Sequence, residues 1–231
     1  MTERGMIFNG EMVRALLSGR KTQTRRIVKG TDGAVKFCKE WDINGKEVFV
    51  VFGEKDHTGM NPVLGAISCP FGAVGDRIWV RETWGVVSHA FSDDGLMIDW
   101  VPDRPATAIN EMPFGNGYYS GHAIYAADGD FTWGDDDGYE DGRSCWKPSI
   151  HMPRWASRIL LEITGVRVER LKSISDGDAI REGCSTADMK SGDCVADVFA
   201  RLWASIYGSD SWNANPWVWV IEFKRVEGGA A

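Results

Sequence analysis

The sequence lacks paired cysteines. It has five cysteines, an odd number, and no two of them show the C-x-x-C spacing of a zinc or redox site. The four histidines are scattered along the chain. These absences argue against a disulfide framework and a structural zinc site, so we expect neither a metal nor another cofactor. Reduced thiols are typical of the cytoplasm, where we expect the protein to be found.

Long apolar runs are also missing. No stretch reaches the roughly 20 apolar residues that span a bilayer, and the first residues lack the apolar core of a secretion signal. We therefore expect no membrane insertion and no secretion. Hydrophobic residues make up 43% of the 231 residues, an ordinary share that can form a sizeable core in one large domain, with or without an insertion.

Charge is spread unevenly along the chain, whose formal net charge is −7. Residues 1–30 carry seven basic and two acidic side chains, whereas residues 91–142 carry twelve acidic side chains and one basic side chain, Arg104. An acidic protein binds long polyanions poorly, because phosphate contacts need concentrated positive charge. A basic loop on an acidic body suits a small anionic or polar ligand, or a short nucleic-acid segment.

The first third of the chain alternates between strand and helix patterns. Residues 6–8 predict a short strand, and the apolar spacing after Asn9 predicts a helix that Gly19 ends. The basic loop 19–26 follows that helix. Residues 35–52 predict a β-hairpin around Asn44-Gly45, the preferred pair of a type I′ turn.

The remaining regular elements follow from their own patterns. Residues 77–82 predict a strand, and residues 158–171 predict a long strand with a bulge or bend at Gly165, where the apolar parity shifts. A capping box at Ser175 opens a short helix, and an amphipathic helix and a final strand come next. These last two elements span residues 195–206 and 217–224.

Residues 88–145 show no strong periodicity and are rich in glycine and aspartate. We expect an irregular, acidic surface insertion there. The run Trp133-Gly134-Asp135-Asp136-Asp137-Gly138 has neither the spacing nor the closing glutamate of an EF-hand, so a solvated loop is expected instead of a calcium site.

An ordered series of motifs resembles the ASCH domain, a relative of the PUA RNA-binding barrel. The resemblance covers about residues 5–85 and 145–226. It is carried by Gly19-Arg20-Lys21-Thr22-x-Thr24-x-Arg26, the strand segment 75–84, the long strand 158–171, the segment Ile174–Gly183, and the terminal strand. The stretch Trp146-Lys147-Pro148-Ser149-Ile150-His151-Met152-Pro153 is similar to longer ASCH proteins of phages and prophages.

This resemblance implies an α+β fold: one PUA-like mixed β-barrel domain over residues 1–231, with flanking helices and the acidic insertion at about 88–145. It also implies a pocket for a nucleobase, a nucleoside or an RNA segment. Some small bacterial ASCH proteins are amidohydrolases that remove an acetyl group from the exocyclic amine of cytidine. Their catalytic residues fall, by motif, on Lys21, Thr24 and Glu182.

The chemistry of these residues fits amide hydrolysis. Lys21 lies between basic neighbours, and a desolvated lysine can act as a base toward the Thr24 hydroxyl. Glu182 can orient Lys21, hold a water or pass a proton to the leaving amine. Further candidate ligand-binding residues are Arg20, Arg25, Arg26, Glu82, Trp79 and Trp84.

Several alternatives stay open at this point. The basic loop can be a solvated surface, Glu82 the polar end of a strand, and Trp79 and Trp84 core residues. The protein can also be a non-catalytic RNA-binding module, an RNA-cleaving ASCH protein, or a phage interaction protein that uses its acidic insertion. The sequence does not decide whether the chain is an enzyme, and it leaves the oligomeric state open.

Overall fold

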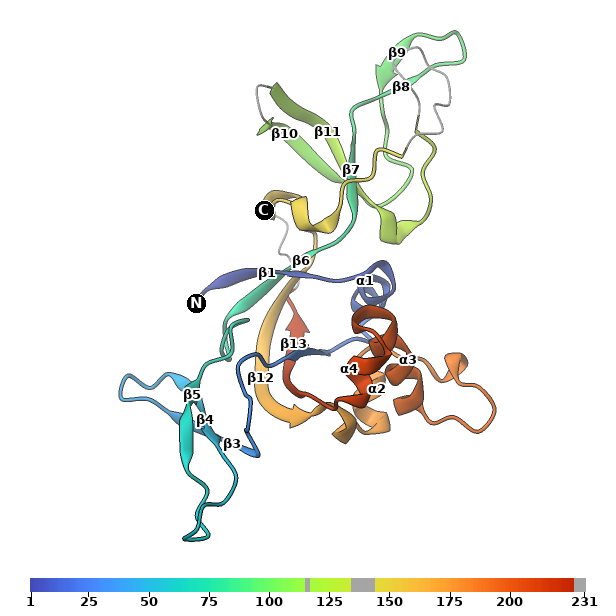
Figure 1. Cartoon of the computed structure of the whole chain (residues 1–231). Coiled ribbons are helices and arrows are strands. Elements are labelled where there is room, and N and C mark those ends of the chain that lie inside the picture. The colour runs from blue at the N-terminus through green and yellow to red at the C-terminus, as the bar shows by residue number, and fades with distance from the viewer. Residues whose placement is uncertain (115–116, 134–143, 227–231) are drawn as a thin grey trace. The chain divides into compact units, whose positions relative to one another are not determined.

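The computed structural model describes residues 1–114, 117–133 and 144–226 (Figure 1). The fold is of the mixed α+β class and rich in strands, as the sequence predicts. The chain forms two compact units. The first unit comprises residues 1–4, 18–78 and 161–225, and the second comprises residues 5–17, 79–160 and the residues from 226 onward.

The largest sheet has five strands in the order β1-β6-β12-β13-β2. β1, β6 and β12 each cross the boundary between the units along the chain. The sheets of the described residues are open, and the barrel that the sequence suggests is not closed in them. The bounds are β1 Glu3–Ile7, β6 Arg77–Arg81, β12 Leu160–Arg170, β13 Trp217–Arg225 and β2 Gln23–Ile27.

The predicted bulge in the long strand is confirmed. β12 pairs antiparallel with β13, and the register shifts between Ile163 and Gly165. Gly165 therefore lies at the bulge, opposite Glu222 of β13.

Helices α2 (Asp176–Arg181), α3 (Val195–Tyr207) and α4 (Ser209–Asn213) belong to the first unit. The predicted capping box of α2 is confirmed, because the Ser175 side chain accepts a hydrogen bond from the Asp178 amide and the Asp178 side chain accepts one in return. The apolar face of α3 packs with Val218 and Val220 of β13 in one hydrophobic core. The helices therefore bury one face of β13.

A three-stranded sheet of β3, β4 and β5 completes the first unit. β3 (Lys36–Trp41) and β4 (Glu47–Phe52) form the predicted hairpin, and β5 (Val63–Ile67) pairs antiparallel with β4. Within the turn pair only Gly45 has a positive φ, 72°, so the turn is not of type I′.

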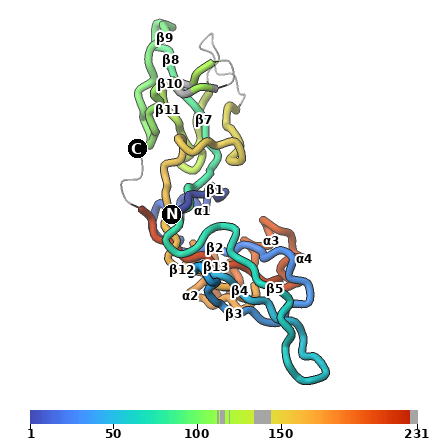
Figure 2. The backbone as a smooth tube through the Cα atoms, turned by 90° about the vertical axis from the view of Figure 1, so that its left-hand side faces the viewer, coloured from blue at the N-terminus to red at the C-terminus, as the bar shows by residue number. Residues whose placement is uncertain are grey.

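The second unit contains α1 (Gly10–Leu17) and the sheet β10-β11-β7. Asn9 caps α1 as predicted, with the Met12 amide donating to its side chain at 2.9 Å. β10 (Thr107–Phe114) and β11 (Gly117–Tyr125) run side by side (Figure 2), and β11 continues the sheet to β7 (Trp84–Val87). The core of this unit includes Trp84, Tyr125 and Met152.

Residues 88–145 are more regular than the sequence predicts. Besides β10 and β11, they form the hairpin of β8 (His89–Phe91) and β9 (Met97–Asp99). The expectation of an irregular loop is therefore corrected for this part of the insertion. Of the predicted acidic run, residues 134–138 lie outside the described residues.

The described residues also form several short 3-10 turns. None of the described helices is long and apolar enough to cross a membrane. The 3-10 turns are Ala126–Asp128, Ser149–His151, Arg154–Ala156, Leu171–Ser173 and Thr186–Asp188.

Candidate functional site

The basic loop runs directly into β2, beside the C-terminal end of α2. The Thr22 amide donates to the Arg181 carbonyl at 2.8 Å, and the Phe223 amide donates to the Thr22 carbonyl at 2.9 Å. These backbone contacts hold the loop between α2 and β13. Glu182 is the C-cap residue of α2, so its side chain leaves the helix toward β2.

Lys21 and Glu182 form a buried ion pair. Each residue is only 2% exposed. The Lys21 Nζ donates to the Glu182 carbonyl oxygen and to its Oε2, both at 2.8 Å. Two of the three candidate catalytic residues are therefore in direct contact, although 160 residues separate them in sequence.

Arg25 occupies the other side of the Glu182 carboxylate. Its Nη1 donates to Glu182 Oε1 at 3.0 Å, and its Nη2 lies 3.3 Å from Glu169 and 3.4 Å from Asp178. The guanidinium also lies 5.8 Å from the ring of Phe199. Each oxygen of Glu182 thus faces one cation, and Arg25 connects Glu182 to two further carboxylates.

The environment of Lys21 weakens its hold on the ammonium proton, although Lys21 is the cation of the ion pair with Glu182. Burial lowers the pKa of the Lys21 ammonium below its ordinary value of 10.5. The charge and hydrogen bond of Glu182 oppose this change, and the positive charge of Arg26 adds to it. The net direction is downward, so Lys21 gives up a proton more readily than a solvated lysine.

Asp178 is the second buried carboxylate of this cluster. Burial alone would raise its pKa, but hydrogen bonds from Arg181 and Ser175 and the charge of Arg25 hold that pKa well below the usual range. Gln23 donates to both the carbonyl and the Oδ1 of Asp178, at 3.1 and 3.3 Å. Asp178 therefore stays ionised and fixes the position of β2 against α2.

Thr24 lies on the opposite face of β2 from Gln23 and Arg25, because side chains alternate along a strand. It is buried and pairs in register with Ile221 of β13. Its Oγ1 accepts a hydrogen bond from the Arg26 Nη1 at 2.9 Å. No hydrogen bond joins Thr24 to Lys21 among the described contacts, so the direct base–hydroxyl pair of the hypothesis is not formed here.

Arg20 is the most exposed member of the basic loop. Its Nη1 donates to the Gly183 carbonyl at 3.4 Å, and its Nε donates to Ser18 at 3.2 Å. Arg20 thus lies beside the same end of α2 as Glu182 and is open to solvent.

Glu82 belongs to the second unit and has its own cation. Its two carboxylate oxygens accept from the Nε and Nη2 of Arg158 at 2.9 and 3.0 Å. Arg158 also binds Asp128 and lies 3.9 Å from the ring of Tyr125. Burial raises the pKa of Glu82, while Arg158 opposes that rise. This arrangement is a separate buried ion-pair cluster.

The two tryptophans among the candidate ligand-binding residues have different surroundings. Trp84 is 2% exposed and packs edge-on against Trp155, with ring centroids 5.6 Å apart. Trp79 is half-buried, with the guanidinium of Arg81 over its ring at 5.3 Å. Trp84 is a core residue, whereas Trp79 is partly accessible.

Sequence reasoning missed Gln23, Asp178 and Glu169 as members of the Lys21 cluster. The signal for Gln23 is the alternation of β2, which puts it on the face of Arg25. Asp178 was predicted only as part of the capping box, although a carboxylate on the first turn of a helix can also face a neighbouring strand. Glu169 gives no separate signal in the sequence.

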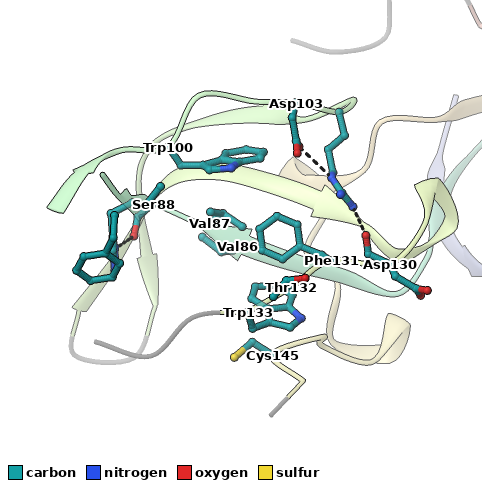
Figure 3. Close-up of a pocket in the computed structure, with 14 residues that line it drawn as sticks. Val86, Val87, Ser88, Trp100, Asp103, Asp130, Phe131, Thr132, Trp133 and Cys145 are labelled. Carbon is teal, nitrogen blue, oxygen red and sulfur yellow. Dashed lines mark hydrogen bonds and ion pairs between the residues drawn. The ribbon is translucent and has the colours of Figure 1, made fainter. Parts of the chain in front are cut away.

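A hollow of about 600 Å³ lies in the second unit beside β7 and β8 (Figure 3). Aromatic rings form part of its wall, with Phe131 and Trp133 4.8 Å apart. Its Arg104 donates to the Asp103 carboxylate at 3.2 Å and to the Asp130 carbonyl at 2.9 Å. The charge of Arg104 is thus already held by protein atoms. None of the predicted site residues lines this hollow.

Within the described residues, no group of three or more histidine, cysteine or acidic side chains could hold a metal ion. Comparison with protein-family models, with curated proteins and with solved structures gave no match for this chain.

Proposed function

We propose that the protein is an ASCH-type amidohydrolase with a PUA-like fold, which removes an acyl group from the exocyclic amine of a modified cytidine. One observation carries the proposal: Lys21 is buried against the carboxylate of Glu182, with its Nζ 2.8 Å from Oε2. Burial lowers the pKa of the Lys21 ammonium, which suits a general base.

The residues support a reaction in two stages. In the first, the Thr24 oxygen attacks the acyl carbon, and its proton passes to Lys21 through a water. The Arg26 guanidinium donates to the Thr24 oxygen and stabilises negative charge on it. Protonated Lys21 then supplies the proton that the departing amine needs, and Glu182 stabilises the lysine charge in between.

In the second stage, water attacks the acyl ester on Thr24. Neutral Lys21 accepts the proton of that water, and the carboxylic acid leaves as Thr24 regains its hydroxyl. In the described structure no hydrogen bond joins Lys21 to Thr24, so in this proposal a water carries the proton between them. The five unpaired cysteines support the proposed cytoplasmic location.

The test is hydrolysis of acetylated cytidine, followed by chromatography. We expect turnover by the wild type, and a loss of about a hundredfold or more in Lys21→Met, Thr24→Val and Glu182→Gln. Lys29→Met is the matched control, because Lys29 is an exposed lysine close to the same strand. A folded wild type without turnover contradicts the proposal, as does equal loss in the control.

A non-catalytic nucleoside- or RNA-binding module is the second candidate. The observation in its favour is that Arg20, in the basic loop, is exposed and can contact a phosphate. In this candidate the buried pairs of Lys21 and Arg25 with Glu182 support the loop and have no catalytic role. Ligand binding that survives Thr24→Val, without turnover, would support this candidate.

A further inference from the structure

A pocket of about 490 Å³ lies in the second unit, and none of Lys21, Thr24 and Glu182 lines it. Most of its lining comes from residues 147–155, and Trp84 contributes to it. This stretch includes the segment Lys147–Pro153, which is conspicuous in the sequence and has no part in the proposed hydrolysis. The volume lies within the range of small-molecule sites, about 300–1,000 Å³.

Two prolines make the wall of this pocket rigid. Pro148 precedes the 3-10 turn Ser149–His151, and Pro153 precedes the 3-10 turn Arg154–Ala156. The His151 amide donates to the Pro148 carbonyl at 2.9 Å, and the Ala156 amide donates to the Pro153 carbonyl at 3.2 Å. Because proline fixes φ, this wall loses little conformational entropy when a ligand binds.

Aromatic rings form the apolar part of the pocket. Trp84 is buried, whereas Trp155 is half-buried and presents part of its ring, at 89° to the ring of Trp84. The backbones of Trp84 and Lys147 exchange two hydrogen bonds, of 3.2 and 2.7 Å. These bonds fix the start of the Lys147 side chain beside the rings. A flat ligand can therefore stack where a cation is close by.

The charge of the lining has one sign. Its titratable side chains are Lys147 and His151, and no carboxylate occurs among the described lining residues. We propose that this pocket binds a planar aromatic ring that carries an anionic group. The ring lies against Trp155 and the prolines, and Lys147 and His151 donate hydrogen bonds to the anion.

Two kinds of compound share this chemistry: nucleoside monophosphates and aromatic carboxylates. The site residues differ from Lys21, Thr24 and Glu182, so the inference does not depend on the proposed hydrolysis. Binding here should be unchanged in Lys21→Met.

Isothermal titration calorimetry with four probes tests the proposal: cytidine 5′-monophosphate, cytidine, 2-naphthoate and inorganic phosphate. We expect at least one of the two aromatic anions to bind at least about tenfold more tightly than cytidine or phosphate alone. Preference for the monophosphate assigns the site to nucleotides, and preference for naphthoate assigns it to aromatic acids.

Variants locate the binding. Lys147→Gln removes the charge of a half-buried side chain and should weaken the binding of the anions about tenfold, with little effect on cytidine. Trp155→Leu should weaken the binding of every aromatic probe, and Trp155→Phe should restore part of the lost affinity. The matched controls are Lys190→Gln and Trp41→Leu, which alter exposed residues of the first unit. The proposal is overturned if neither aromatic anion binds, or if the controls weaken binding as much.

Discussion

At the scale of single residues, Glu182 is the central group of the Lys21 cluster, because it is the carboxylate that both buried cations share. Lys21 donates to one of its oxygens and Arg25 to the other. Removing one partner from a buried ion pair leaves an uncompensated charge, which costs more than the pair contributes when it is intact. The partners should therefore differ in how much stability their removal costs.

We expect Glu182→Gln to lower the free energy of unfolding by about 3–5 kcal/mol, because two buried cations then lose their shared carboxylate. Lys21→Met should cost clearly less, since Glu182 keeps Arg25. Urea unfolding followed by circular dichroism measures both, with exposed Glu54→Gln as the matched control. If Lys21→Met costs as much as Glu182→Gln, the shared-carboxylate account is wrong.

At the scale of elements, close backbone approach limits which residues the second unit tolerates. Gly121 in β11 has φ 89°, and a Cβ there would lie 2.3 Å from the Val87 carbonyl oxygen of β7. The obstacle is backbone, which cannot rotate away as a side chain can. Gly95 also has a positive φ, 76°, but a Cβ there would meet nothing within 4 Å.

Gly121→Ala should therefore destabilise the protein by about 2–4 kcal/mol, and Gly95→Ala by only about 1 kcal/mol from backbone strain. The melting temperatures of the two variants separate the cost of the Cβ contact with β7 from the cost of the positive φ. Equal losses would show that β7 and β11 can move apart at little cost.

The elements best predicted from the sequence are those whose apolar pattern is long. α3 has its apolar face at helical spacing over three turns, and the parity shift at Gly165 correctly located the bulge of β12. The strands of residues 88–125 were missed for physical reasons. β8 and β9 have only three residues each, and β10 has a register shift between Ile109 and Met112 that interrupts its alternation.

The sequence motifs predicted only part of the candidate site. The motif spacing pointed to Lys21 and Glu182, and the structure brings them within 2.8 Å of each other. Thr24 follows the same motif, yet strand alternation turns its side chain to the other face of β2. Glu82 and Trp84 were grouped with the basic loop by their motif, whereas each has its own partners in the second unit.

At the scale of the whole molecule, residues 1–30 offer less accessible positive charge than their composition suggests. Of their seven basic side chains, Lys21 and Arg25 are buried and paired with carboxylates. Arg20 and Lys29 remain exposed in and beside the loop. The chain as a whole carries a formal net charge of −7. Long polyanions should therefore be repelled more than they are attracted.

This charge balance separates the two candidate functions. For a nucleoside amidohydrolase, we expect a single-stranded RNA 20-mer to bind weakly at 150 mM salt, with Arg20→Gln changing that binding little, because few phosphates are neutralised. Fluorescence anisotropy over a salt series measures this, since each phosphate contact adds about 0.7 to the slope of log affinity against log salt. A steep slope that Arg20→Gln reduces by about one contact would instead show that the loop follows an RNA backbone. In that case Lys21 and Glu182 would be supports for a binding surface, and the buried pair would need no catalytic role.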